Sequence, residues 1–104
     1  LGSKLIITII ELFNENIPKQ IDDLRYAVEN NDPKTARRLA HTMKGSSAQM
    51  GARKMFTLAA EMEIMAEQGN LTSIGPRIDE LKSAFETYSL AVAEWQKDID
   101  LKTE

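Results

Sequence analysis

The sequence predicts an all-α protein, an antiparallel up-down four-helix bundle with a short additional helix at the N-terminus. Apolar residues recur every three or four positions through most of the chain, which is the spacing of one helix face. Pro and Gly, which interrupt helices, are scarce, and so is the strand-type alternation of apolar and polar residues. A chain of 104 residues has room for one hydrophobic core, so we expect residues 1–104 to form a single domain.

The N-terminal part of the chain is expected to form two helices. Segment 3–12 contains the run LIITII, whose β-branched residues suit a strand. Because no partner strand is recognisable, we interpret this segment as a short helix that lies across one end of the bundle. Segment 13–28 has one apolar stripe and ends at the NNDP sequence of residues 30–33. The stripe consists of Phe13, Ile17, Ile21, Leu24 and Val28.

The next helix is expected to begin at Asp32 and Pro33. Asp is a preferred N-cap residue, and Pro is well suited to the first turn of a helix. Gly51 is a plausible point for this helix to end. Its apolar face consists of Ala36, Leu39, Ala40, Met43, Ser47 and Met50.

Two more helices complete the predicted bundle. One has its apolar residues at Met55, Leu58, Met62 and Met65 and ends near Gly69. The last begins within residues 71–76 and is expected to be the longest. Its stripe consists of Ile78, Leu81, Phe85, Tyr88, Val92 and Trp95. We interpret the methionines and aromatic residues of these stripes as mostly core residues, because of their helical spacing, and not as a cofactor site.

The composition excludes several kinds of site. The chain has no cysteine, so disulfides and cysteine-based sites are excluded, and one histidine cannot supply a usual zinc ligand set. We therefore expect no metal and no cofactor. The longest apolar run is far shorter than the roughly 20 residues of a membrane-spanning helix. With no recognisable secretory signal, we expect a cytoplasmic protein that does not bind membranes.

Positive charge is concentrated in residues 34–54, although the net charge of the chain is −3. This segment contains no Asp or Glu, and its basic residues are Lys34, Arg37, Arg38, Lys44, Arg53 and Lys54. The pattern predicts either a surface for an anionic partner or a solvated basic face. We do not expect nucleic-acid binding, because the chain is negative overall and the segment has no aromatic residue on which bases could stack.

His41 is the only histidine, and its helical phase predicts that it faces outward. At about 100° per residue, it lies roughly 140° from the centre of the apolar stripe of its helix. The residues that share its side of the helix, or lie close to it, are Lys34, Arg37, Arg38, Lys44, Gly45 and Ala48. We therefore expect an exposed imidazole beside cations, although an ordinary surface histidine remains an alternative.

Gly45 suggests that something large approaches His41. A glycine inside a helix costs about 1 kcal/mol relative to Ala. Helical side chains lean toward the N-terminus, so a side chain at position 45 would overhang His41. Ala48, further along the same face, is also small. The alternatives for Gly45 are fraying of the helix end and close helix packing, and its position opposite the apolar stripe argues against packing.

Two charged residues are candidate partners of the imidazole. The Lys44 ammonium, three residues after His41, could hold an anionic group attached to the ring, or it could be solvated. No carboxylate lies within a turn of His41 on its own helix. The antiparallel return of the next helix brings Glu63 or Ala60 level with His41. Glu63 could therefore accept a hydrogen bond from the ring or be an ordinary surface residue, and both interpretations stay open.

The sequence AHTMKGSSAQMGA at residues 40–52 resembles the signature of histidine-containing phosphotransfer (HPt) domains of two-component phosphorelays. The resemblance covers nearly the whole chain. The matching residues are His41, the run Lys44-Gly45-Ser46-Ser47, and Gly51-Ala52. The resemblance implies a four-helix bundle whose exposed histidine accepts a phosphoryl group from a receiver-domain aspartate and passes it to another receiver aspartate.

The resemblance also implies roles for the neighbours of His41. Lys44 would steady the phosphoryl oxygens, Gly45 would give the partner access, and Glu63 would hydrogen-bond the other ring nitrogen. Docking would use Arg37, Arg38 and Ala48, together with apolar residues of the first helix such as Ile6 or Ile9. The alternative function is that of a helical adaptor that binds a receiver or kinase domain and transfers nothing.

The implied partners are response-regulator receiver domains and a hybrid sensor histidine kinase. The chain has no glycine-rich phosphate loop and no kinase motif, so it would be a carrier without kinase activity of its own. Mg²⁺ would be held by the receiver. We expect a monomer that forms a transient interface of less than about 1,200 Å² with its partner.

Overall fold

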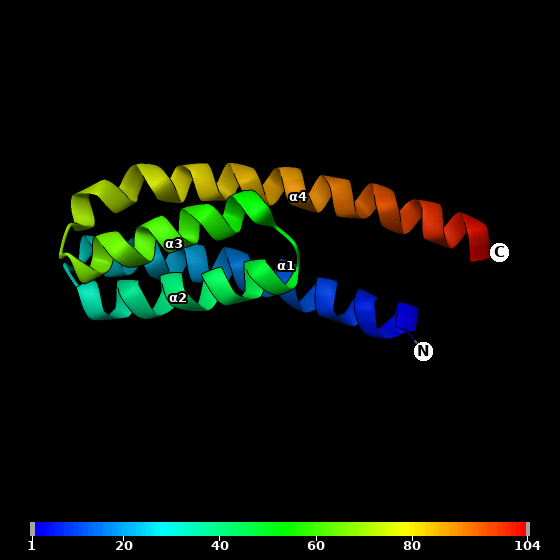
Figure 1. Ribbon diagram of the computed structural model, residues 1–104, viewed down its shortest axis with the longest axis horizontal. Coiled ribbons are helices and arrows are strands. Elements are labelled where there is room, and N and C mark those ends of the chain that lie inside the picture. The colour runs from blue at the N-terminus through cyan, green and yellow to red at the C-terminus, as the bar shows by residue number, and fades with distance from the viewer. Residues whose placement is uncertain (1, 104) are drawn as a thin grey trace.

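A computed structural model describes residues 2–103, which form four α-helices and one turn of 3₁₀ helix (Figure 1). The elements are α1 (Gly2–Glu29), α2 (Pro33–Gln49), α3 (Arg53–Glu67), η1 (Leu71–Ser73) and α4 (Ile74–Thr103). The described residues contain no strand. Short connections join the helices into an antiparallel bundle, so the predicted all-α four-helix bundle is confirmed.

One prediction about the N-terminus is wrong. Segment 3–12 is helical, but it continues without a break into α1 and does not form a separate helix across the end of the bundle. Residues 3–17 contain no Gly or Pro, and the spacing of Ile10, Phe13 and Ile17 keeps one face of α1 in phase. A helix with no interruption in its sequence and a continuous apolar face has no reason to end there.

The start of α2 follows the predicted capping pattern. Asp32 is the N-cap, and its carboxylate accepts a hydrogen bond of 3.2 Å from the backbone N–H of Thr35. Pro33 occupies the first helical position. In the preceding turn, the amide of Asp32 donates to the carbonyl of Ala27 at 2.8 Å. These local contacts set the direction in which α2 leaves the turn.

Glycines with positive φ end the second and third helices. Gly51 has a φ of 65° and Gly69 has a φ of 71°, in the left-handed region that favours glycine. The following amides close both turns, with Ala52 donating to Ser47 at 2.9 Å and Asn70 to Met65 at 2.8 Å. The chain therefore reverses sharply after α2, and α3 returns along it.

The apolar stripes meet in one hydrophobic core. The largest fully buried apolar side chains are Ile17, Leu24, Met43, Met55, Met62, Ile74, Ile78 and Leu81. α2 packs most extensively against α3, which places the two helices that carry His41 and Glu63 in close contact. None of the helices described here is long and apolar enough to cross a membrane.

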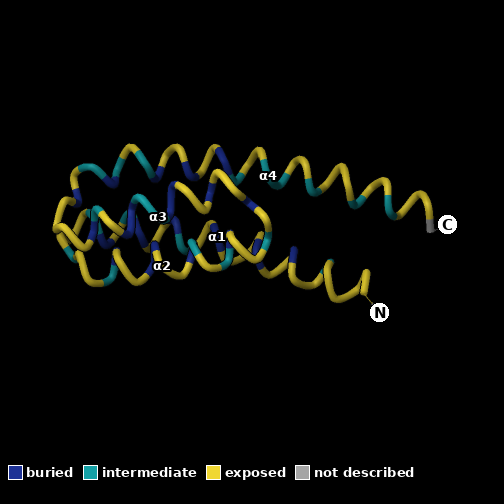
Figure 2. The backbone as a smooth tube through the Cα atoms, in the orientation of Figure 1, coloured by how far each residue is buried: buried dark blue, intermediate teal, exposed yellow. Residues whose placement is uncertain are grey.

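Beyond the turn between α2 and α3, only α1 and α4 continue. The first turns of α1 and the last turns of α4 extend together past that turn (Figure 1), and most of their residues are exposed (Figure 2). Val92 is only partly buried and Trp95 is 43% exposed, so the prediction that their stripe lies in the core fails at this end. The physical reason is that α2 ends at Gln49 and α3 starts at Arg53, so neither helix extends far enough to cover them.

Candidate functional site

His41 lies near the middle of α2 on its solvent face. Its side chain is 63% exposed, whereas the adjacent Ala40 and nearby Met43 are fully buried. This contrast follows from the helical phase, because residues on opposite sides of α2 face the core and the solvent. The predicted outward orientation of His41 is confirmed.

Glu63 on α3 holds one nitrogen of the imidazole. His41 Nδ1 and Glu63 Oε2 are 2.8 Å apart, and the Glu63 side chain is only 11% exposed. The antiparallel return of α3 brings together these two residues, which are 22 positions apart in sequence. The interpretation of Glu63 as an ordinary solvated residue is therefore wrong, and Ala60 has no side-chain acceptor to take its place.

Two cations on α2 surround the same carboxylate. Lys44 Nζ lies 2.7 Å from Glu63 Oε1, and an Arg37 guanidinium nitrogen lies 4.0 Å from Oε2. The hydrogen bond from Lys44, with a further contribution from His41, holds the pKa of the Glu63 carboxyl below its usual value, although burial acts in the opposite direction. Glu63 is therefore ionised at neutral pH.

The ionised carboxylate determines which ring nitrogen is available. A carboxylate can only accept hydrogen bonds, so His41 Nδ1 must donate to it. In the neutral ring the proton is then on Nδ1, and Nε2 keeps its lone pair. The arrangement can therefore present a nucleophilic nitrogen to a partner from a fixed ring orientation.

The surface beside His41 is open. Gly45 is exposed, and a Cβ added there would meet no heavy atom within 4 Å outside the local helix backbone. Close helix packing therefore does not explain the glycine. Ala48 is exposed on the same face, as are Arg37 and Arg38 on the preceding turn. The predicted site residues thus share one face, with Glu63 reaching it from α3.

Two features of the site were not predicted from sequence. The first is the ion pair between Lys44 and Glu63, because the spacing along α2 gives no information about which residue of α3 Lys44 meets. The second is a groove between α1 and α2, which we call the α1–α2 groove. Its lining residues include Ile9, Leu12, Gln20, Thr42, Ser46, Gln49 and Met50. Thr42 places one edge of this groove next to His41.

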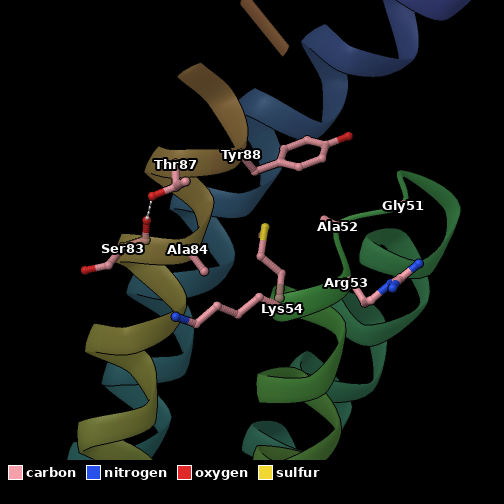
Figure 3. Close-up of a pocket in the computed structure, with 9 residues that line it drawn as sticks. Gly51, Ala52, Arg53, Lys54, Ser83, Ala84, Thr87 and Tyr88 are labelled. Atoms are coloured by element: carbon pink, nitrogen blue, oxygen red, sulfur yellow. Dashed lines mark hydrogen bonds between the residues drawn. The ribbon is translucent and has the colours of Figure 1, made fainter. Parts of the chain in front are cut away.

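Another hollow lies away from His41, between the start of α3 and the middle of α4 (Figure 3). Lys54 extends across it toward α4, whereas Arg53 points away. Neither His41 nor Glu63 lines it. Among residues 2–103, no group of three or more His, Cys, Asp or Glu side chains could hold a metal ion. The exposed imidazole is therefore the strongest candidate for chemistry.

Comparison with known protein families agrees with this site. Residues 8–91 match the Hpt domain, and the matched segment contains His41, Lys44 and Glu63. No curated protein and no solved structure matched the chain. Because the match spans most of its length, the chain belongs to the Hpt domain family, which implies a histidine phosphotransfer role in a phosphorelay.

Proposed function

We propose that this protein is a phosphorelay intermediate that accepts a phosphoryl group on His41 from the aspartate of one receiver domain and passes it to the aspartate of another. The observation that carries the proposal is the exposed imidazole whose Nδ1 is bonded to the buried, ionised Glu63. Hpt domains typically interact with receiver domains, which supports the choice of partner.

The proposed transfer uses the lone pair of His41 Nε2. That nitrogen attacks the phosphorus of an aspartyl phosphate, the Nε2–P bond forms, and the P–O bond to the aspartate breaks to release its carboxylate. The imidazole gains positive charge because Nδ1 keeps its proton, and Glu63 lies where its negative charge stabilises that ring. Transfer to a second receiver is the reverse of these steps with a different aspartate.

Lys44 is the residue we assign to the phosphoryl oxygens. It is already bonded to Glu63 Oε1, but an ammonium has three donors. Lys44 can therefore keep that bond while donating another hydrogen to a phosphoryl oxygen. The imidazole leans toward the turn that carries Arg37 and Arg38, so their positive charge adds to the attraction for a phosphorylated partner.

The proposed docking face surrounds His41. Gly45 and Ala48 leave space for the receiver, and Arg37 and Arg38 supply positive charge. The α1–α2 groove, with Ile9 at one edge, supplies apolar contact. In this mechanism the receiver brings the aspartyl phosphate and Mg²⁺, while this protein brings the nucleophile and acts as a carrier without kinase activity. A hybrid sensor kinase that carries a receiver is the proposed upstream partner, and the carrier acts as a monomer.

The test is phosphoryl transfer from receiver domains loaded with ³²P-labelled acetyl phosphate in the presence of Mg²⁺. We expect acid-labile, base-stable label on the wild-type protein and none on His41→Gln. The circular dichroism spectrum of the variant should be unchanged, because His41 is exposed and makes no core contact. Equal labelling of His41→Gln would overturn the assignment. A variant that binds receivers and still supports signalling would indicate the adaptor function instead.

A further inference from the structure

We propose that receiver domains also dock at the open end of the bundle, in an apolar groove formed by α1 and α4 with Trp95 on its rim. We call it the end groove. The proposal rests on the proposed function, because it assigns a second contact to the partner that approaches His41. It identifies Trp95 as a residue that determines which receivers bind.

Figures 1 and 2 show that α1 and α4 extend past the other helices. The residues that line the end groove lie between these two helices and the end of α2. Its lining residues include Ile6, Ile9, Met50, Tyr88, Val92 and Trp95. Ile6 is 46% exposed and Trp95 is 43% exposed, so large apolar surface on both walls faces water. Such a patch on a polar helix pair is typical of a binding surface.

The groove is already shaped before any partner arrives. The hydroxyl of Tyr88 donates a 2.6 Å hydrogen bond to the carbonyl of Met50, which joins α4 to the end of α2. The Tyr88 ring also packs edge-on against Phe13 of α1, with ring centroids 5.6 Å apart. These contacts hold three helices at the base of the groove. A preformed apolar surface binds a partner at a smaller entropic cost than one that must be ordered first.

The end groove is continuous with the α1–α2 groove beside His41. Ile9, Gln49 and Met50 line both of them. Thr42 and Gln49 are seven residues apart on α2, or about 10 Å along the helix at 1.5 Å per residue. A transient interface of up to about 1,200 Å² gives each partner a footprint of up to about 600 Å², which is roughly 28 Å across. One receiver that reaches His41 can therefore also cover the end groove.

This continuity favours a receiver over a second copy of the chain. A second copy seated in the end groove would cover Ile9 and Met50, which also belong to the groove beside His41. It would therefore compete with the receiver at the face that needs to be open for transfer. A receiver that presents apolar side chains to both grooves would occupy the α1–α2 groove and the end groove in one complex.

Trp95 lies outside residues 8–91, the segment that matches the family. The family match therefore does not cover the proposed contact with Trp95. Trp is among the residues enriched at the energetic centres of interfaces. A receiver without a matching apolar side chain would lose this contact, which gives the protein a means of choosing between receivers.

The test measures binding of receiver domains to the full chain carrying His41→Gln, so that docking is observed without transfer. Isothermal titration calorimetry should show that adding Trp95→Ala raises Kd about tenfold. Ile6→Lys, on the opposite wall, should raise Kd as well. The matched control is Leu90→Ala, another exposed apolar residue of α4 that does not line the groove, and it should leave Kd unchanged.

Trp95 also reports docking directly, because it is the only tryptophan in the chain. With a receiver whose own tryptophans are replaced by Phe, its fluorescence should shift to shorter wavelength on binding. Receiver binding with unchanged emission, and with the same Kd for Trp95→Ala, would overturn the inference. So would a dimer in sedimentation that dissociates with Trp95→Ala. Receivers that bind through Trp95 but never label His41 of the wild-type protein would overturn the proposed function alone.

Discussion

The two faces of α2 have different roles: one packs in the core, and the other carries the proposed chemistry. Ala36, Ala40, Met43 and Ser47 are fully buried on one face, whereas His41, Gly45 and Ala48 are exposed on the other. Ala40 and His41 are adjacent in sequence, so a rotation of about 100° separates a core residue from the proposed nucleophile. We therefore expect substitutions on the buried face to change the free energy of unfolding, and those on the exposed face to change phosphoryl transfer.

The largest effect is expected on the buried face, from Met43→Ala. The side chain is fully buried, and its removal leaves a cavity, so the free energy of unfolding should fall by about 2–5 kcal/mol. Urea unfolding measures this change. The rate of transfer per folded molecule should stay near that of the wild type, because Met43 points away from His41.

The matched comparison is His41→Gln, which should abolish transfer and lower the free energy of unfolding much less than Met43→Ala, because it removes one partner of Glu63 and no core side chain. If Met43→Ala slowed transfer by folded molecules tenfold, the two faces would be coupled and the proposed division would be wrong.

Glu63 of α3 contacts the exposed face of α2 but is itself buried. Its ionisation should make the free energy of unfolding depend on pH. Its pKa is lowered in the folded protein, so the ionised form stabilises the fold above the unfolded value of 4.5, and this contribution is lost as pH falls below it. The effect should be smaller than that of the core cavity, because His41 and Lys44 are partly solvated. Thermal unfolding at pH values from 7 to 3 measures it.

The control for this prediction is Glu63→Gln, which cannot ionise. It should have a flatter dependence of melting temperature on pH than the wild type over the same range. Parallel curves for the two proteins would show that Glu63 is not the group whose pKa is lowered by folding.

On the exposed face, Gly45→Leu should slow transfer about tenfold without destabilising the helix. The new side chain would lean over His41 and obstruct the receiver, an effect equivalent to about 1.4 kcal/mol in the transition-state barrier. Because position 45 is open, replacing glycine should raise helix stability by up to about 1 kcal/mol. Stopped-flow or quench-flow transfer and urea unfolding measure the two effects.

Gly45→Ala is the matched control, since a single methyl group gives most of the helix stabilisation and reaches less far. If Leu at this position transferred phosphate at the normal rate, the proposed role of Gly45 in access would be rejected.

The smallest effect is expected from Ser47→Ala. Ser47 Oγ is buried and has no hydrogen-bond partner within the described residues. Burying an unpaired hydroxyl is unfavourable, and Ala has the higher helix propensity, so the variant should be more stable by about 1 kcal/mol. Thermal melting measures the gain, and a loss of stability would indicate that the hydroxyl has a partner in solution.

Local rules were sufficient for much of the fold. The spacing of Ala36, Ala40 and Met43 placed the core face of α2, and the N-cap at Asp32 and the turn at Gly51 fixed its ends. Each of these features depends on residues within a few positions of one another. The outward orientation of His41 follows from the same spacing, so it could be predicted as well.

The prediction failed where it depended on the length of neighbouring helices. Val92 and Trp95 continue the apolar stripe of α4, but a stripe becomes core only if another element covers it. Likewise, nothing in segment 3–12 shows whether it turns across the bundle or continues along it. The absence of Gly and Pro from residues 3–17 was the available signal for a continuous α1.

By itself, the sequence determined the helical segments after residue 12, the two ends of α2, its buried face and the exposure of His41, because these depend on local spacing and backbone preferences. Only the tertiary structure decided that Glu63 contacts both His41 and Lys44, and that Trp95 borders an open groove. Such contacts depend on the axial register of one helix against another. That register is set by the packing of the whole core, and not by the residues that meet.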